Sequence, residues 1–284
     1  PLPWHGGWIW VPSLGVEFTV HIDGLSAQFL ALISGIGTLV CVYASGYLAH
    51  EPRRGRLFLI LLAFMLAMAG AVSADHLLVL FVFWELTSLT SFLLVGFHHE
   101  DETARNAARQ ALLITLRGGL ALLAAILLLG DIAGSYSLQA LIAQKQALAA
   151  DPRLPVALIL LLVGCFTKSA QFPFHFWLPD AMTAPTPVSA YLHSATLVKL
   201  GIYLLARLDP VFNDLWLWES VLVGVGTFTA VWGAVLALRE RDLKRILAGS
   251  TISALGTLTL LIGLPNPGAS LAVIAFLFAH ALYK

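Results

Sequence analysis

Seven side chains that could carry protons lie inside apolar stretches of the sequence. They are Glu85, Lys168, His175, His193, Lys199, His280 and Lys284. A lysine removed from water can load and release a proton near neutral pH, and histidine titrates in that range without assistance. A charge at the centre of a membrane helix costs about 2.5–3.5 kcal/mol on insertion scales, so such residues usually serve function. The set predicts a path for protons.

The spacing of four of these residues supports this hypothesis. His193 and Lys199 are six residues apart, on roughly the same half of one predicted helix. His280 and Lys284 are four residues apart, which places them one turn apart on the same helix face. For each histidine taken alone, a hydrogen-bonded interior residue is the alternative interpretation.

Glu85 and Lys168 are predicted to lie at similar depth. Glu85 is about eight residues into its apolar stretch, which is ~12 Å at 1.5 Å per residue and close to the middle of a ~30 Å hydrocarbon core. A nearby lysine would compensate a buried carboxylate, so the sequence allows a Glu85–Lys168 pair. A fixed ion pair that only orients two helices is the alternative, but burying such a pair seldom adds stability.

The segment that carries Lys168 is predicted to be a broken helix over 168–187. Its prolines are Pro173, Pro179, Pro185 and Pro187. Broken helices at bilayer depth occur where protein or trapped water satisfies the freed backbone groups. His175 follows Lys168 by seven residues, just after the first proline. The chain is then expected to resume as one apolar helix over 187–207.

Composition shows which class of protein must position these residues. Hydrophobic residues make up 59% and charged residues 11% of the chain, and soluble proteins have about 25% charged residues. We therefore predict an all-α polytopic membrane protein with about nine transmembrane helices, each near the ~20 residues that a helix needs to cross a bilayer. The predicted spans are 25–49, 56–73, 77–98, 104–130, 155–176, 187–207, 218–238, 243–263 and 268–284.

Basic residues predict the orientation of these spans. Nine of them lie in or beside the loops 50–55, 99–104, 177–186 and 239–242, and three lie on the other side. The positive-inside rule therefore places the first set of loops in the cytoplasm. The lead-in over 1–24 contains Trp residues suited to the bilayer interface. The external loop 131–154 contains a weakly amphipathic helix candidate.

Several classes of function are excluded or disfavoured. A net charge of zero argues against nucleic-acid binding. Cys41 and Cys165 lie in apolar runs and are interpreted as small core residues. No phosphate-binding glycine loop, nucleophile elbow or Cys/His metal spacing is present, so we expect neither a cofactor, nor a metal, nor an enzyme active site. The chain begins with Pro1 and stops inside an apolar run, so we expect a fragment of a longer protein.

Arg117 has no single interpretation at this point. It lies in mid-span, directly before Gly118 and Gly119. It could extend toward the membrane surface, pair with a carboxylate, or reflect a local peculiarity.

Five motifs resemble a known family. They are WELTSLTSFLLVGF, GCFTKSAQFPFHFWLPDAM, APTPVSAYLHSATLVKLGIYLLAR, RDLKRILAGSTIS and HALYK. They resemble the antiporter-like proton-translocating subunits shared by respiratory complex I and the Mrp-type multisubunit Na+/H+ antiporters, and are most similar to the A-type subunits of the Mrp antiporters. The resemblance implies a fold of about 14 helices with two inverted five-helix repeats. It divides the chain into 1–55, a lead-in with the N-terminal helix, 56–207, the first repeat, and 208–284, the truncated start of the second.

The resemblance also implies roles for the buried residues. Glu85 and Lys168 match the family's carboxylate–lysine pair, Lys199 matches the linking lysine, and His193 matches the bridging histidine. A further pair on the central axis is matched by His280 and Lys284.

The implied function is proton translocation in a multisubunit Na+/H+ antiporter of a prokaryotic cell (inner) membrane. Its implied partners are other hydrophobic subunits and the lipid bilayer, with H+ and Na+ as the transported ions. Two alternatives stay open from the residues. One is a component of a redox-driven complex, such as complex I or a membrane-bound hydrogenase. The other is a scaffold or channel-like subunit whose charges only hold helices together.

Overall fold

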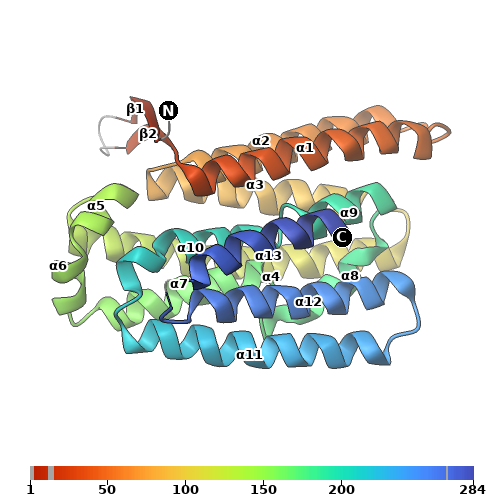
Figure 1. The fold of residues 1–284 in the computed structure, drawn as a ribbon. Coiled ribbons are helices and arrows are strands. Elements are labelled where there is room, and N and C mark those ends of the chain that lie inside the picture. The colour runs from red at the N-terminus through yellow and green to blue at the C-terminus, as the bar shows by residue number, and fades with distance from the viewer. Residues whose placement is uncertain (1–2, 12–15, 267) are drawn as a thin grey trace.

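The chain forms a bundle of roughly parallel helices with a small β-hairpin at one end (Figure 1). The computed structural model describes residues 3–11, 16–266 and 268–284. The long helices are α1 (Gly24–Tyr47), α2 (Arg54–Ser73), α3 (Leu77–Val95), α4 (Glu102–Ala133), α7 (Leu154–Lys168), α9 (Thr186–Ser194), α10 (Lys199–Phe212), α11 (Trp216–Arg239), α12 (Leu243–Ile262) and α13 (Ala269–Tyr283). The short elements are β1 (Trp4–Val11), β2 (Val16–Ile22), α5 (Leu138–Ala143), α6 (Lys145–Ala150), η2 (Phe174–Phe176), α8 (Trp177–Asp180) and η3 (Ala181–Thr183).

The membrane spans agree with those predicted from the sequence. Within the described ranges, seven helical stretches are long and apolar enough to cross a membrane, with α9 and α10 counted as one. Two shorter apolar helices, α7 and α13, occupy the other two predicted spans. α7 is short because it ends at Lys168, where the predicted break begins.

The lead-in is more regular than the sequence led us to expect. Strands β1 and β2 pair antiparallel, and Trp8 stacks on Phe18 with ring centroids 4.6 Å apart. Trp4, Trp8 and Trp10 are exposed, as residues at a bilayer interface would be. Residues 1–2 and 12–15 of this predicted segment lie outside the described residues.

The two predicted sets of loops lie at opposite ends of the bundle. The α1–α2, α3–α4 and α11–α12 connections share one end, and the hairpin, α5 and α6 lie at the other (Figure 1). The helix candidate in the external loop is divided at Gln144 into α5 and α6. Leu138, Leu141 and Leu148 are buried, so this loop covers an end of the chain's own bundle.

The predicted uninterrupted helix over 187–207 is wrong. α9 ends at Ser194 and α10 begins at Lys199. No proline lies in between; instead the Thr196 hydroxyl donates to the Tyr191 carbonyl at 2.7 Å, and the Lys199 amide donates to the Thr196 carbonyl at 2.9 Å. These bonds give the backbone an alternative to the helical pattern. The membrane-embedded part of the chain therefore has two broken helices.

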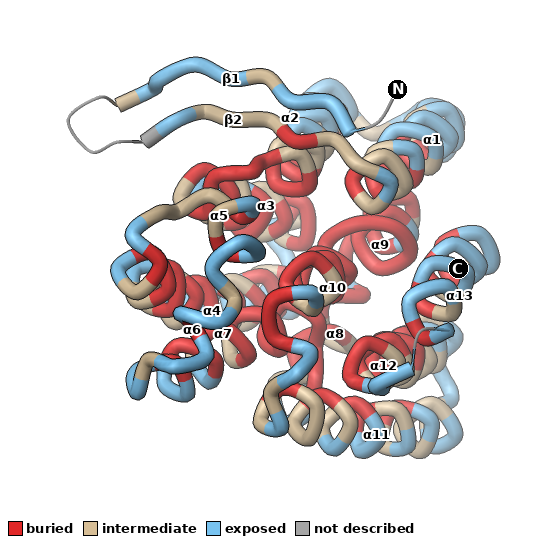
Figure 2. Tube along the Cα trace, turned by 60° about the vertical axis from the view of Figure 1, so that its left-hand side comes forward, coloured by how far each residue is buried: buried red, intermediate tan, exposed pale blue. Residues whose placement is uncertain are grey.

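The second broken helix, made of α9 and α10, forms the inside of the molecule. Figure 2 shows α9 and α10 buried almost throughout, whereas α1, α11 and α13 each expose one side. Residues carried by α9 and α10, which include His193 and Lys199, are thus removed from both lipid and water.

Candidate functional site

Lys168 is the last residue of α7 and is fully buried. Its Nζ donates a hydrogen bond to the Trp84 carbonyl oxygen at 3.0 Å and to the Ser88 hydroxyl at 2.7 Å. The same ammonium lies 5.2 Å from the centroid of the Trp84 ring, within range of a cation–π interaction. Helix α3 therefore holds the charge of Lys168 through neutral groups.

Glu85 lies near this lysine. No ion pair within 4.0 Å joins the two side chains in the described part of the chain, and Glu85 Oε1 is buried without a hydrogen-bond partner. The two groups still interact electrostatically. The structure therefore brings Glu85 and Lys168 into one region. The direct ion pair that the sequence allows is not formed between them.

Two glycines of α4 make room for this arrangement. A Cβ at Gly119 would collide with the Glu85 carboxylate, and one at Gly118 would collide with the Thr167 side chain. Both glycines are buried, and α4 packs on α3 and α7 together. The glycines directly after Arg117 thus let Glu85 and the end of α7 approach α4 closely.

The break after Lys168 leaves polar groups inside the protein. Ser169 Oγ and Gln171 Oε1 are buried and have no partner in the described structure. Other freed groups are satisfied, because Trp177 Nε1 donates to the Thr167 carbonyl at 3.1 Å. A Cβ at Gly201 of α10 would collide with Ser169 Oγ, so the break lies directly against α10.

Lys199 begins a second group of ionisable residues. It is fully buried, and its Nζ donates to the Leu277 carbonyl of α13 at 3.0 Å. His193 on α9 and His280 on α13 are buried; neither ring nitrogen of His193 has a hydrogen-bond partner among the residues described, and the His280 ring interacts with the backbone of Ser194. Lys284 hydrogen-bonds the Ser250 hydroxyl of α12.

The members of this second group are close enough to interact electrostatically, as groups of like charge. His280 interacts with Lys199 and Lys284, and His193 interacts with Lys284. Four residues predicted from two separate stretches of sequence therefore converge where α9, α10 and α13 meet.

His175 lies apart from these groups. Its Nε2 accepts a hydrogen bond from Trp232 Nε1 of α11 at 2.9 Å, and its ring stacks on Phe172 at a centroid distance of 5.7 Å. Its contacts in the described structure are with α11 and its own segment, which gives it no direct link to Lys168 or Lys199.

A buried network that sequence reasoning missed joins α10 to the start of α1. Arg207 donates to both Asp23 carboxylate oxygens, at 2.5 and 3.0 Å, and to the Ser26 hydroxyl at 2.6 Å. Burial alone would raise the pKa of Asp23, but the hydrogen bonds from Arg207 and the Ser26 amide lower it to about 2. Asp23 is therefore a carboxylate at neutral pH. The available signal was Arg207 at the end of the predicted span 187–207, where it counts among the three basic residues on the external side.

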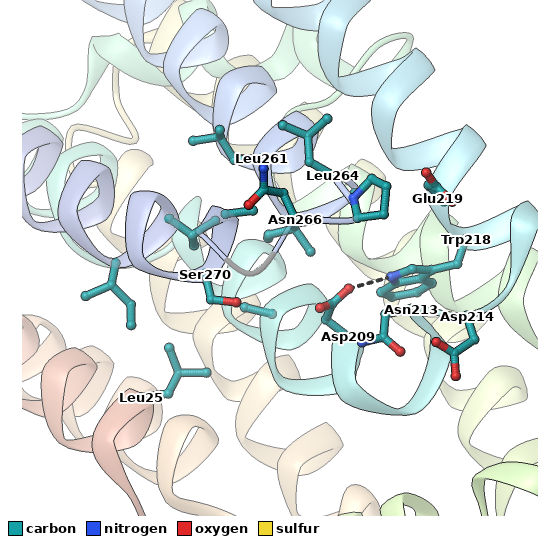
Figure 3. Close-up of a pocket in the computed structure, with 17 residues that line it drawn as sticks. Leu25, Asp209, Asn213, Asp214, Trp218, Glu219, Leu261, Leu264, Asn266 and Ser270 are labelled. Carbon is teal, nitrogen blue, oxygen red and sulfur yellow. Dashed lines mark hydrogen bonds between the residues drawn. The ribbon is translucent and has the colours of Figure 1, made fainter.

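Polar cavities lie at both ends of the bundle. One of about 420 Å³ is lined by Asp209, Asn213, Trp218 and residues of the α12–α13 connection (Figure 3). The other, of about 770 Å³, is lined mainly by the start of α4, the α8–η3 region and the start of α12. None of the seven predicted proton-carrying residues lines either cavity.

No cluster of three or more His, Cys, Asp or Glu residues that could hold a metal ion is found within residues 3–11, 16–266 and 268–284. What the arrangement offers is a series of buried lysines and histidines between two polar ends.

Known protein families include one whose sequence model matches most of this chain. A family model described as "NADH:quinone oxidoreductase/Mrp antiporter, TM" matches residues 74–284. The chain belongs to this antiporter family. A second model, described as "NADH-Ubiquinone oxidoreductase (complex I), chain 5 N-terminus", matches residues 8–58. The predicted family resemblance is confirmed.

Curated relatives with high identity are antiporter subunits. A probable K(+)/H(+) antiporter A/B subunit of Rhizobium meliloti is 49% identical over 97% of this chain and 28% of that protein. The Na(+)/H(+) antiporter A-type subunit of Alkalihalophilus pseudofirmus is 48% identical over 97% of this chain and 36% of that protein. The chain thus spans about a third of the length of these relatives.

Solved structures show the same fold. A chain of the Mrp complex from Dietzia sp. DQ12-45-1b has a TM-score of 0.93 and 42% identity, covering 100% of this chain and 31% of that one. A chain of the membrane-bound sulfane sulfur reductase, an archaeal respiratory membrane complex, has a TM-score of 0.84 and 24% identity, covering 96% and 56%. The second likeness concerns the fold alone. The chain is a multi-pass membrane protein of prokaryotic type.

Proposed function

We propose that this chain is a proton-translocating part of a multisubunit monovalent cation/H+ antiporter. Glu85 and Lys168 form the first station of its proton path. Lys199, His193, His280 and Lys284 form the second station.

The observation that carries this proposal is the environment of the two fully buried lysines. Lys168 and Lys199 are bound only by carbonyl and hydroxyl oxygens, with no carboxylate within 4.0 Å in the described structure. A charge fixed for stability would be expected in a closed ion pair, because an uncompensated buried charge is strongly destabilising. A lysine that is stable with and without its proton suits a relay.

The gap between the two stations is polar on the Lys168 side. Ser169 Oγ and Gln171 Oε1 are buried without partners in the described structure, and Ser169 lies against Gly201 of α10, two residues after Lys199. Buried polar groups of this kind are commonly satisfied by water. The break in α7 thus supplies groups that favour a proton step from Lys168 toward α10.

His175 has a weaker place in this proposal. Its hydrogen bond to Trp232 and its separation from the second station favour an auxiliary role for His175, beside the broken segment that follows Lys168. The division into inverted repeats at 56–207 and 208–284 likewise stays a prediction. The other subunits of the complex are the proposed partners.

The decisive experiment measures cation/H+ exchange by the complete complex in everted membrane vesicles. Glu85→Ala and Lys168→Ala should each abolish exchange, because either change removes half of the first station. Lys145→Ala is the matched control, since Lys145 is a partly exposed loop lysine that pairs with Asp214. Normal exchange in both Glu85→Ala and Lys168→Ala would rule the proposal out.

The same vesicles separate the alternatives. Exchange driven by an imposed proton gradient, without an electron donor, fits the antiporter; a requirement for electron transfer would indicate a redox-driven complex. The identities above favour the antiporter. The two relatives are named for different cations, K+ in one and Na+ in the other, so both ions belong in the assay.

A further inference from the structure

Arg117 is exposed on the outer side of α4 and has no partner in the described structure. Among the described residues it makes no hydrogen bond, ion pair or ring contact. Its neighbours on the exposed stripe of α4 are Leu113, Leu116 and Leu120, whose side chains are all exposed. An isolated cation thus stands in an apolar surface.

The position along α4 places this cation deep in the membrane. Arg117 is 15 residues from the first and 16 from the last residue of α4, or ~22–24 Å from either end at 1.5 Å per residue. It also lies at the level of Glu85, because Gly119 contacts that carboxylate. A guanidinium at this depth would have to cross ~15 Å of hydrocarbon to reach water, which is further than an arginine side chain extends.

An arginine facing lipid at this depth is costly and needs an anion. The neighbouring carboxylate of Glu85 cannot serve as this anion, because it contacts the opposite face of α4 at Gly119. Residues 117 and 119 point ~200° apart on a helix with 3.6 residues per turn. The compensating anion must therefore come from outside this chain segment.

We propose that Arg117 and the leucines around it form a docking surface for a membrane helix of a neighbouring subunit, and that this helix carries an Asp or Glu at the same depth. The carboxylate would pair with the guanidinium by two parallel hydrogen bonds, the geometry that arginine favours. Apolar residues one turn to either side would pack on Leu113, Leu116 and Leu120. This inference does not depend on the proton path.

Photo-crosslinking in the complete, assembled complex tests the surface. Benzoylphenylalanine placed at Leu120 of the full-length protein should crosslink to a membrane helix of another subunit, and mass spectrometry should find an Asp or Glu in that helix. Crosslinks to lipid alone, to a second copy of this protein, to another part of the same polypeptide, or to a helix without a carboxylate overturn the proposal.

Charge exchange then tests the pairing. Arg117→Ala should lower the recovery of intact complex about tenfold, the effect of a 1.4 kcal/mol loss. The protein should still reach the membrane, because Arg117 makes no hydrogen bond, ion pair or ring contact within the described chain. Arg117→Asp combined with Arg at the identified carboxylate should restore recovery. The control is Arg109→Ala, an exposed arginine of the same helix two turns nearer its start, which should have no effect.

Equal recovery of the unaltered complex and the Arg117→Ala variant, or no rescue by the exchanged pair, contradicts the proposal. Should Arg117→Ala fail to accumulate in the membrane, the crosslink from position 120 in the otherwise unaltered protein decides.

Discussion

At the scale of single residues, both fully buried lysines rely on neutral acceptors. Lys168 has a carbonyl and a hydroxyl of α3, and Lys199 has a carbonyl of α13. Hydrogen bonds to neutral oxygens hold an ammonium less firmly than bonds to a carboxylate. In the proposed proton path, this difference would allow a buried lysine to lose and regain its proton without a large structural change.

Ser88 is therefore expected to matter for transport. Ser88→Ala removes the 2.7 Å bond to Lys168 and leaves the ammonium with the Trp84 carbonyl. Hydrogen bonds to charged groups contribute ~1.5–3 kcal/mol, so exchange in everted vesicles should fall about tenfold or more. Ser88→Thr, which keeps the hydroxyl, should retain most of the activity.

The control for this variant is Ser91→Ala on the same helix. The Ser91 hydroxyl is also buried but bonds only to the Ser88 carbonyl at 2.8 Å in the described structure. If Ser91→Ala reduced exchange as much as Ser88→Ala, general disturbance of α3 would explain both, and the role assigned to Ser88 would be wrong.

At the scale of the elements, glycine decides where helices meet backbone to backbone. On α11 and α12, Gly226 faces Gly256: a Cβ on Gly226 would lie 2.8 Å from the Gly256 carbonyl oxygen. Contacts this close admit no side chain. The pair α11 and α12 forms the most extensive helix contact among the described elements for this reason.

Gly226→Val should accordingly be far more damaging than Gly224→Val. Gly224 lies on the same helix with open space around its Cβ position, so the change in helix propensity is common to both variants. We expect Gly226→Val to destabilise by about 1–3 kcal/mol or more, and Gly224→Val to stay within ~0.5 kcal/mol. Thermal unfolding of the purified protein in detergent measures the difference, and equal midpoints would refute the packing argument.

The two broken helices show what the sequence reveals about elements. The break after Lys168 was predictable because its prolines cannot continue a helix. The break between Ser194 and Lys199 has no such mark: it depends on a threonine hydroxyl that competes for a backbone carbonyl, and on the packing of α9 and α10 in the interior. The prolines that cause the first break can be seen in the local sequence. The packing that contributes to the second break can be seen only in the tertiary structure.

At the scale of the whole molecule, the sequence predicted which residues are buried but not how they contact one another. The cost of charge in apolar stretches singled out Lys168, Lys199, His193 and His280, which are buried. It also singled out Glu85, His175 and Lys284, which are half-buried. The partners of Lys168 are a backbone carbonyl and a serine on α3. Neither type of group can be recognised from an apolar sequence as the partner of a lysine. The roles of Gly118 and Gly119 were also hidden, because they depend on which helices lie beside α4.

The orientation of the molecule links these sites to the two sides of the membrane. Nine basic residues at one end against three at the other predict that the α11–α12 connection lies in the cytoplasm. The cavity of about 770 Å³, which Glu102 and Lys244 line, is then the cytoplasmic one. Protons entering from outside would start instead near α5, α6 and the hairpin.

Single cysteines test this orientation in a background with Cys41→Ser and Cys165→Ser. Gln146→Cys in the α6 region and Arg241→Cys between α11 and α12 are both exposed positions. A membrane-impermeant maleimide applied to intact cells should label position 146 and reach position 241 only after permeabilisation, because the excess of basic residues keeps that end inside. Labelling of 241 first would reverse the membrane sidedness, and with it the side from which each station of the proposed path is loaded.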